Sequence, residues 1–165
     1  MTRIDKVNQR IILELFKDGR RPYVEIAREM GVTEGTIRKR VKELLAGGII
    51  RITAVPHLDR LGYDFIGIVG LQVGLHALRD VGRELAKHAN VCYLANVTGR
   101  FEYIAIIAAK SSKEFASFME DVVANIPDIL RTETFVTLHI YKGAGFSLDT
   151  TQIIGNLDVL ESGEG

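Results

Sequence analysis

Hydrophobic residues recur at helical spacing through the first third of the chain. Residues 4–16 carry apolar side chains at every third or fourth position, which predicts a helix that ends at Asp18. Two shorter amphipathic helices are predicted within residues 23–50, with Gly31 ending the first and Thr33 capping the second. Two short helices joined by a tight turn are typical of a helix-turn-helix. We therefore predict a three-helix unit at the N-terminus.

The second helix of this pair has a polar face that suits contact with DNA. Its hydrophobic positions predict one buried stripe, formed by Ile37, Val41, Leu44 and Leu45. The outward arc is narrow at its first turn and basic, and consists of Gly35, Thr36, Arg38, Lys39 and Lys42. A helix end of this kind can enter the DNA major groove, where small and polar side chains reach base edges. Exposed basic residues are also often merely solvated, so DNA binding is a hypothesis that needs support from the rest of the chain.

The segment after the second helix changes to strand character. Residues 49–55 (IIRITAV) follow a Gly-Gly break and alternate β-branched with other residues, which predicts a strand or wing attached to the helix. A wing beside the helix-turn-helix favours the DNA hypothesis. Residues 56–63 are bracketed by a proline and a glycine, and are predicted to be a linker with room for one helical turn.

Strand and helix patterns alternate beyond the linker. The predicted elements are a strand over 64–75, a helix over 76–89, a strand-strand hairpin over 91–98 and 102–110, a helix from Ser111 or Ser112 to Pro127, and a long strand over 129–142. The order βαββαβ predicts a ferredoxin-like arrangement with two helices on one face of an antiparallel sheet.

The predicted fold class is therefore α+β, with an N-terminal winged helix-turn-helix and a C-terminal ferredoxin-like βαββαβ domain. The expected boundaries are 1–55 for the first domain, 56–63 for the linker, 64–142 for the second domain and 143–165 for a C-terminal extension. A sheet this apolar on both faces needs a cover for its free face, and a second copy of the chain would provide one. The extension carries a short apolar cluster that could dock on a neighbouring subunit.

Charge is unevenly distributed, although the formal net charge is zero. Residues 1–53 carry 12 Lys and Arg against 7 Asp and Glu, and the rest of the chain carries 9 against 14. We therefore expect only the N-terminal unit to meet a polyanion. Cys92 is the only cysteine, and the first residues are polar, so we expect a reducing cytoplasmic environment without a secretory signal. The longest apolar stretch is well short of the roughly 20 residues of a membrane helix.

Four segments together resemble one known family. They are IDKVNQRIILELFKDGR in the first helix, EIAREMGVTEGTIRKRVKELLAGGII in the helix-turn-helix and wing, AVPHLDRLGYDFIGIVGLQV in the linker and first strand, and VTGRFEY in the hairpin. With the predicted domain order, they make residues 3–142 similar to the Lrp/AsnC (feast/famine) transcriptional regulators. The resemblance implies a DNA-binding regulator whose C-terminal domain, the RAM domain, dimerises through its sheets. It also implies assembly of dimers into octamers or open helices, and in many members an amino acid bound between dimers.

The resemblance also assigns candidate site residues. The recognition helix corresponds to residues 34–45, and Arg40 matches a basic position common in the family. Its place at the edge of the buried stripe suits pairing with an acid, or covering the hydrophobic core with its stem, as well as it suits contact with DNA. The effector-site hairpin corresponds to Thr98, Gly99, Arg100, Phe101 and Glu102. Glu102 stands where the family commonly has Asp, which bears on the ligand's identity. The alternatives are a plain hairpin glycine with positive φ for Gly99 and a solvated strand-end charge for Glu102.

Two other functions are compatible with the sequence. Sirohaem decarboxylases resemble the same family in both domains and use histidines and arginines around a tetrapyrrole; the histidines available here are His57, His76, His88 and His139. An architectural DNA-binding protein would differ only in lacking an effector. The sequence contains no metal-ligand spacing, nucleophile-base pair or paired carboxylates. We therefore expect a regulator with no catalytic residues, cofactor or metal, whose partners are double-stranded DNA, a small-molecule effector and further copies of itself.

Overall fold

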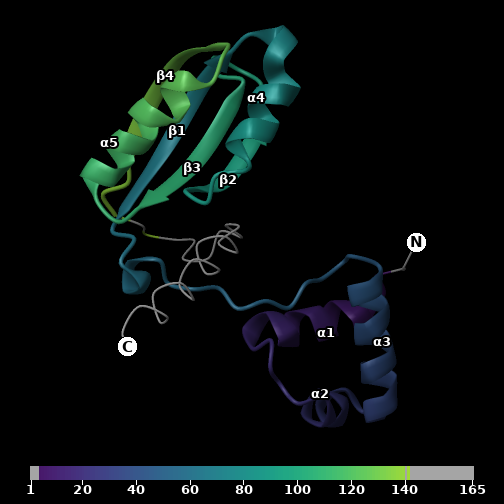
Figure 1. Ribbon diagram of the computed structural model, residues 1–165. Coiled ribbons are helices and arrows are strands. Elements are labelled where there is room, and N and C mark those ends of the chain that lie inside the picture. Colours follow the sequence, from purple (N-terminus) through teal and green to yellow (C-terminus); the bar gives the residue numbers. More distant parts are fainter. Residues whose placement is uncertain (1–3, 140, 142–165) are drawn as a thin grey trace, which may run out of the picture. The chain divides into compact units, whose positions relative to one another are not determined.

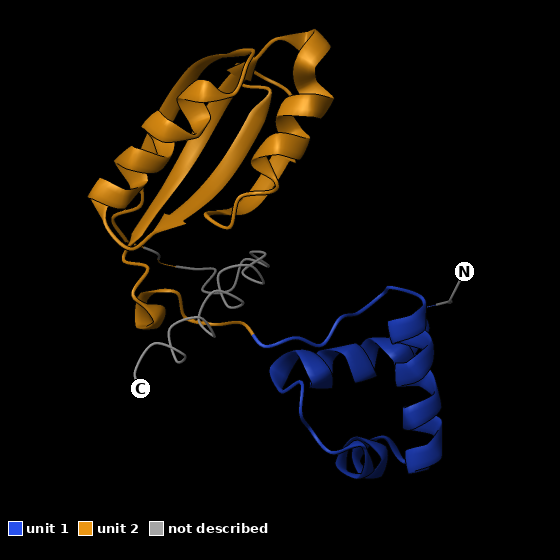
Figure 2. Ribbon diagram, viewed as in Figure 1, with its two compact units in different colours: residues 1–54 blue, residues 55–165 orange. Residues whose placement is uncertain are grey.

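The structure, a computed structural model, describes residues 4–139 and 141 (Figure 1). The chain divides into two compact units, residues 1–54 and residues 55–165 (Figure 2). The predicted C-terminal extension, residues 143–165, lies outside the described residues. No helix in the described part of the chain is long and apolar enough to cross a membrane.

The first unit contains three helices, and their ends follow from local chemistry. The helices are α1 (Lys6–Lys17), α2 (Tyr23–Met30) and α3 (Glu34–Ala46). The Asp5 carboxylate accepts a hydrogen bond from the Asn8 backbone N–H at 2.8 Å and so caps α1. Gly31 ends α2 in the left-handed region, with φ of 65°. The Thr33 hydroxyl accepts from the Thr36 backbone N–H at 3.2 Å and caps α3, as predicted.

The apolar faces of the three helices form one core. Its buried members are Ile11, Leu15, Ile26, Ala27, Ile37, Val41 and Leu44. Leu45 was also expected in this stripe, and this expectation is wrong because its side chain is 42% exposed. At 100° per residue Leu45 lies about 80° from Ile37 around the helix, beyond the arc that α1 and α2 cover. The buried stripe of α3 is therefore narrower than its sequence pattern.

The strand predicted over residues 49–55 does not form. The backbone N–H groups of Ile49 and Ile50 both donate to the Leu44 carbonyl, at 2.9 and 3.4 Å, and so close the end of α3. Residues 51–55 form no β-ladder with a described strand, and the side chains of Ile52 and Val55 are exposed. A strand needs a hydrogen-bonded neighbour, and a β-branched pattern alone does not supply one.

The second unit has the predicted βαββαβ order. Its elements are β1 (Phe65–Val73), η2 (Leu75–Ala77), α4 (Leu78–Leu85), β2 (Val91–Asn96), β3 (Tyr103–Ala109), α5 (Ser112–Asp121), η3 (Val123–Asn125) and β4 (Ile129–Val136). The strands are antiparallel in the order β2-β3-β1-β4. The last strand was predicted to continue to residue 142 but ends at Val136, which pairs with Gly67 near the start of β1. Little of β1 remains to pair beyond that point.

The two faces of the sheet have different surroundings. Helices α4 and α5 lie over the same face (Figure 1), and Val69, Leu71, Ala105 and Ile107 point from the sheet into the core beneath them. The residues that alternate with these point to the other face, which no α-helix of the described residues covers. Large apolar side chains on that face remain partly exposed, among them Ile68, Tyr93 and Phe135. We call this surface the open sheet face.

The predicted linker is docked on a corner of the open sheet face. It contains one 3-10 turn, η1 (Asp59–Leu61), as its sequence allowed. Leu58 and Tyr63 on either side of the turn are buried together with Cys92 and Ala108 of the sheet. This burial raises the pKa of the Tyr63 hydroxyl. Residues 58–63 therefore belong to the packed body of the second unit.

Candidate functional site

The outward face of α3 presents the cationic side chains that the sequence predicted. Lys39 and Lys42 are exposed, and within the described residues neither has an ion-pair partner. Gly35 is exposed in the first turn, and the hydroxyl of Thr36 lies 2.9 Å from that of Thr33. Because Gly35 carries no side chain, the first turn of the helix is narrow. A narrow helix end beside exposed cations is the kind of surface that can enter a DNA major groove.

Arg38 lies on the same face, but its guanidinium has partners. It forms an ion pair with Glu34 one turn earlier and lies 5.7 Å from the centroid of the Tyr23 ring. The Arg38 side chain is still 68% exposed. Binding to a phosphate or a base would therefore replace the Glu34 pair, whose solvent-exposed geometry makes it weak.

Arg40 is turned away from this face and braces the unit. Its guanidinium donates to the Asp5 carboxylate at 2.7 Å and to the Asn8 side-chain oxygen at 3.1 Å. The Asn8 backbone N–H and Arg40 together lower the pKa of the Asp5 carboxyl. Arg40 therefore pairs with an acid, which is one of the roles that the sequence suggested for it. The pair ties α3 to the start of α1.

A second ion-pair network was not predicted from the sequence. Glu14 is buried on the apolar face of α1, where its carboxylate lies 3.1 Å from both Arg10 and Lys17 and pairs with Arg21. Arg21 also pairs with Glu29 of α2. The Lys17 hydrogen bond and the nearby cations lower the pKa of Glu14. The sequence does contain a feature that indicates this network. Glu14 lies among apolar helix positions, and it has cations four residues before it and three residues after it.

The candidate effector hairpin connects β2 to β3. Gly99 has φ of 131°, a conformation that L side chains rarely adopt, so the turn itself requires glycine here. Thr98 and Gly99 are exposed at the tip. Phe101 is buried, and its ring lies directly over Gly70, where an added Cβ would be 2.6 Å from the ring. The hairpin is thus packed onto the open sheet face at the end of β1.

The carboxylate of Glu102 already has a structural partner. One of its oxygens accepts a hydrogen bond from the Val73 backbone N–H at 2.9 Å, and the side chain is half-buried. The Glu102 backbone N–H donates to the Leu71 carbonyl at 3.0 Å. Glu102 is therefore an anchor of the hairpin on β1, which differs from a solvated strand-end charge.

Arg100 is the exposed cation of the hairpin. Its guanidinium donates to the Glu133 carboxylate of β4 at 2.8 Å and lies 4.8 Å from the centroid of the Phe101 ring. The Gln72 amide donates to the Arg100 carbonyl at 2.9 Å. Glu133 and Gln72 could not be predicted from the hairpin sequence, because both come from other strands. Arg100 and Glu133 thus place a cation and an anion beside each other at this end of the sheet.

The histidines considered for a tetrapyrrole site are not gathered together. His76 and His88 line one groove between α4 and α5, whereas His57 and His139 are exposed elsewhere and line no part of it. Within the described residues, no group of three or more His, Cys, Asp or Glu side chains is placed to hold a metal ion.

Comparison with known families matches both units. A model for the AsnC-type helix-turn-helix domain matches residues 4–45, and one for the Lrp/AsnC ligand binding domain matches residues 66–145. An uncharacterised HTH-type transcriptional regulator of Pyrococcus furiosus is 35% identical over 140 residues, which is 84% of this chain and 95% of the relative. The HTH-type transcriptional regulator FL11 of Pyrococcus abyssi is 33% identical over 140 residues, with coverage of 84% and 92%.

Solved structures agree with the fold. The chain is similar to AsnC of E. coli, with a TM-score of 0.81, 23% identity, and coverage of 86% of this chain and 96% of that one. It is also similar to a transcriptional regulator of Neisseria meningitidis in complex with L-Met, with a TM-score of 0.80, 18% identity, and coverage of 85% and 93%. A feast or famine regulatory protein of M. tuberculosis complexed with L-methionine gives a TM-score of 0.78, 18% identity, and coverage of 85% and 95%.

Proposed function

We propose that this chain, which belongs to the Lrp/AsnC family of transcriptional regulators, binds double-stranded DNA through the outward face of α3. The observation that carries the proposal is the pair of exposed cations Lys39 and Lys42, unpaired within the described residues, on a capped helix whose opposite side is locked into the core. Phosphate contacts from lysines supply affinity and register, whereas Gly35, Thr36 and Arg38 lie at the helix end that reaches base edges.

Salt dependence of binding tests the DNA face. Replacing Lys39 or Lys42 by Ala leaves a phosphate without its cation, so affinity falls for every sequence and the slope of log K against log salt decreases by about 0.9 for each such phosphate. Lys113→Ala is the matched control, because this exposed lysine lies on α5 of the other unit. Unchanged affinity and slope in the Lys39 and Lys42 variants would remove the assignment.

The second part of the proposal is an effector at the hairpin of residues 98–102. An α-amino acid needs donors or a cation for its carboxylate and an acceptor for its ammonium group, because leaving either buried and unpaired is costly. Arg100 with the Gly99 backbone suits the carboxylate, and the carboxylates of Glu102 and Glu133 suit the ammonium group. Two of the proteins with the same fold are complexed with methionine, which supports an amino acid or related metabolite as the ligand class.

Calorimetry with the twenty amino acids tests the effector. We expect at least one to bind and to shift the oligomeric state in sedimentation, with a coupling of about 1–3 kcal/mol. Arg100→Ala abolishes the heat, whereas Arg79→Ala, an exposed arginine of α4, does not. Glu102→Gln keeps an acceptor for the Val73 N–H while removing the charge, and it should weaken the ligand without loosening the hairpin. Absence of heat from all twenty would leave an effector-independent regulator.

The third part is self-association through the open sheet face. Half-sites one helical turn apart, about 34 Å, need two recognition helices on one assembly. The open sheet face exposes Ile68, Tyr93 and Phe135 without an internal cover among the described residues. A second copy of the same face would cover them symmetrically, and further association of such dimers would produce the octamer.

A further inference from the structure

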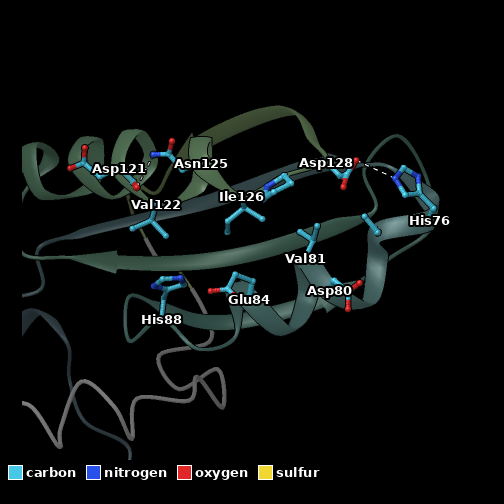
Figure 3. A pocket seen from close by; sticks show the side chains of 12 residues that line it. His76, Asp80, Val81, Glu84, His88, Asp121, Val122, Asn125, Ile126 and Asp128 are labelled. Atoms are coloured by element: carbon cyan, nitrogen blue, oxygen red, sulfur yellow. Dashed lines mark hydrogen bonds and ion pairs between the residues drawn. The ribbon is translucent and has the colours of Figure 1, made fainter.

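A groove on the second unit is used by none of these functions. It runs between α4 and the α5–η3 segment, on the face opposite the open sheet face, and has a volume of about 570 Å³ (Figure 3). Figure 3 shows His76 and Asp128 at one end and His88 at the other. Because it lies on the helix-covered side, the groove stays accessible when the open sheet face is covered.

The floor of the groove is apolar. Val81 and Ile126 line it and are also members of the core, and Val122 is half-buried beside them. A bound side chain would therefore meet hydrocarbon between the two helices. The length of the floor follows α4, whose eight residues rise about 12 Å. That length corresponds to about two turns of a bound helix.

The two walls of the groove are acidic. Asp80 and Glu84 stand one turn apart on α4, and Asp121 and Asp128 stand on the other side. None of the twelve lining residues is Lys or Arg, and the two lining histidines lie at the ends of the groove, where the His76 imidazole is 3.2 Å from the Asp128 carboxylate. Asp121 has no ion-pair partner within the described residues. Asp80 forms an ion pair with Arg83 at 3.8 Å, and Glu84 forms one with Lys87 at 2.6 Å. Neither of these cations lines the groove.

We infer that this groove docks a cationic amphipathic helix of a partner protein. Such a helix would lay an apolar stripe, spaced i, i+3, i+4 and i+7, along Val81, Val122 and Ile126, and its flanking Lys or Arg side chains would meet the two acidic walls. Charge complementarity favours this occupant over other helices. An acidic helix would place like charges against the carboxylates of the walls, and a neutral helix would leave these carboxylates facing apolar surface. The groove contains none of the residues proposed to contact DNA or an effector, so binding in the groove depends on neither of those functions.

Binding of a designed probe tests the groove in the full-length chain. The probe is a capped peptide of about 14 residues with Leu at the stripe positions and Lys at the flanks. A control peptide has Glu in place of each Lys. We expect the cationic probe to bind in fluorescence anisotropy, with an affinity that falls as salt is raised, and the acidic probe not to bind.

Two matched pairs of variants locate the binding. Glu84→Gln with Asp121→Asn should weaken the cationic probe at least about tenfold. Asp64→Asn with Glu120→Gln removes the same charges from exposed positions outside the groove and should change it less than about twofold. Val122→Lys places a cation on the floor and should abolish binding, whereas Ala124→Lys at an exposed η3 position should not.

Other occupants correspond to outcomes that overturn the inference. Equal weakening in the groove and control variants would mean non-specific attraction to an acidic unit. Binding of spermidine with the same dependence on Glu84 and Asp121, without binding of the peptide, would make the groove a site for small cations. Self-association that depends on these two residues would make it an interface between copies of the chain. Binding that is confined to the cationic peptide, and that is weakened or abolished only in the groove variants, establishes the docking surface.

Discussion

The Arg40 guanidinium on α3 donates to the Asp5 carboxylate at 2.7 Å, and Asp5 is the residue that caps α1. One hydrogen-bonded pair therefore joins α3 to the start of α1. Arg40 is a basic residue on α3, the helix proposed to contact DNA, yet its guanidinium pairs with an acid of the same unit. This separates it from Lys39, its immediate neighbour, which has no ion-pair partner among the described residues.

Arg40→Met should lower the stability of the first unit. The variant keeps most of the apolar stem but removes the guanidinium that donates to the Asp5 carboxylate and to the Asn8 side-chain oxygen. We expect a lower urea midpoint, with a loss smaller than the roughly 2–5 kcal/mol of the core truncation Ile37→Ala. Lys39→Met is the control, with an unchanged midpoint and a weaker DNA complex. Equal midpoints for the two variants would contradict the bracing role.

Glu34→Gln should strengthen DNA binding. The substitution releases Arg38 from an exposed i,i+4 pair that costs about 0.3–0.5 kcal/mol to break, which corresponds to about a twofold gain in affinity. Glu43→Gln removes an equal charge near the other end of α3 and provides the control. Gel shifts at low salt measure both. Weaker binding by Glu34→Gln alone would show that the pair positions Arg38 for the complex.

Arg38→Ala should change sequence preference more than overall affinity. If Arg38 contacts a guanine, its removal costs about 1–3 kcal/mol at the preferred base pair and little elsewhere. Selection of bound sequences from a random pool, followed by affinities for single-base variants, measures this. A uniform loss across all sequences would assign Arg38 to the phosphate backbone instead.

Acid should unfold the first unit partly through Glu14. Because the pKa of Glu14 is lowered in the folded state, the unfolded chain binds its proton first, and the stability that the ionised group supplies is present above the ordinary glutamate value, about 4.3. That stability is lost as pH falls through the lowered folded value. Thermal melts from pH 7 to pH 3 should show this loss, and Glu14→Gln should flatten it. The same slope in the variant would place the acid sensitivity elsewhere.

Phe135→Asp should dissociate the assembly. The side chain lies on the open sheet face, 46% exposed, and pairs across strands with Ile68, so a buried carboxylate there would oppose association. Thr134→Asp puts the same charge at an exposed position on the other side of β4. Sedimentation velocity should show a smaller species for Phe135→Asp only. A monomeric parent protein would reject this interface outright.

Where the determinants are local, the sequence alone predicted the structure. Gly31 ends α2 because its backbone is left-handed, and Thr33 starts α3 because its hydroxyl accepts from a backbone N–H three residues on. The βαββαβ order followed in the same way from changes in hydrophobic period. The exposed cations of α3 were identified because their positions follow from the buried side of one helix.

Only the tertiary structure decided which groups have partners from elsewhere in the chain. Residues 49–55 have the sequence pattern of a strand, but no strand of the described residues lies beside them to pair with. The sequence around Glu102 suggests a surface acid, whereas in the fold its carboxylate accepts a hydrogen bond from the Val73 N–H. The Arg100–Glu133 pair joins positions 33 residues apart, and the acidic groove joins two helices from opposite halves of the domain. Periodicity along the chain specifies which side of an element is buried. The groups that meet across elements are set by strand order and register, which act over distances that a local pattern does not encode.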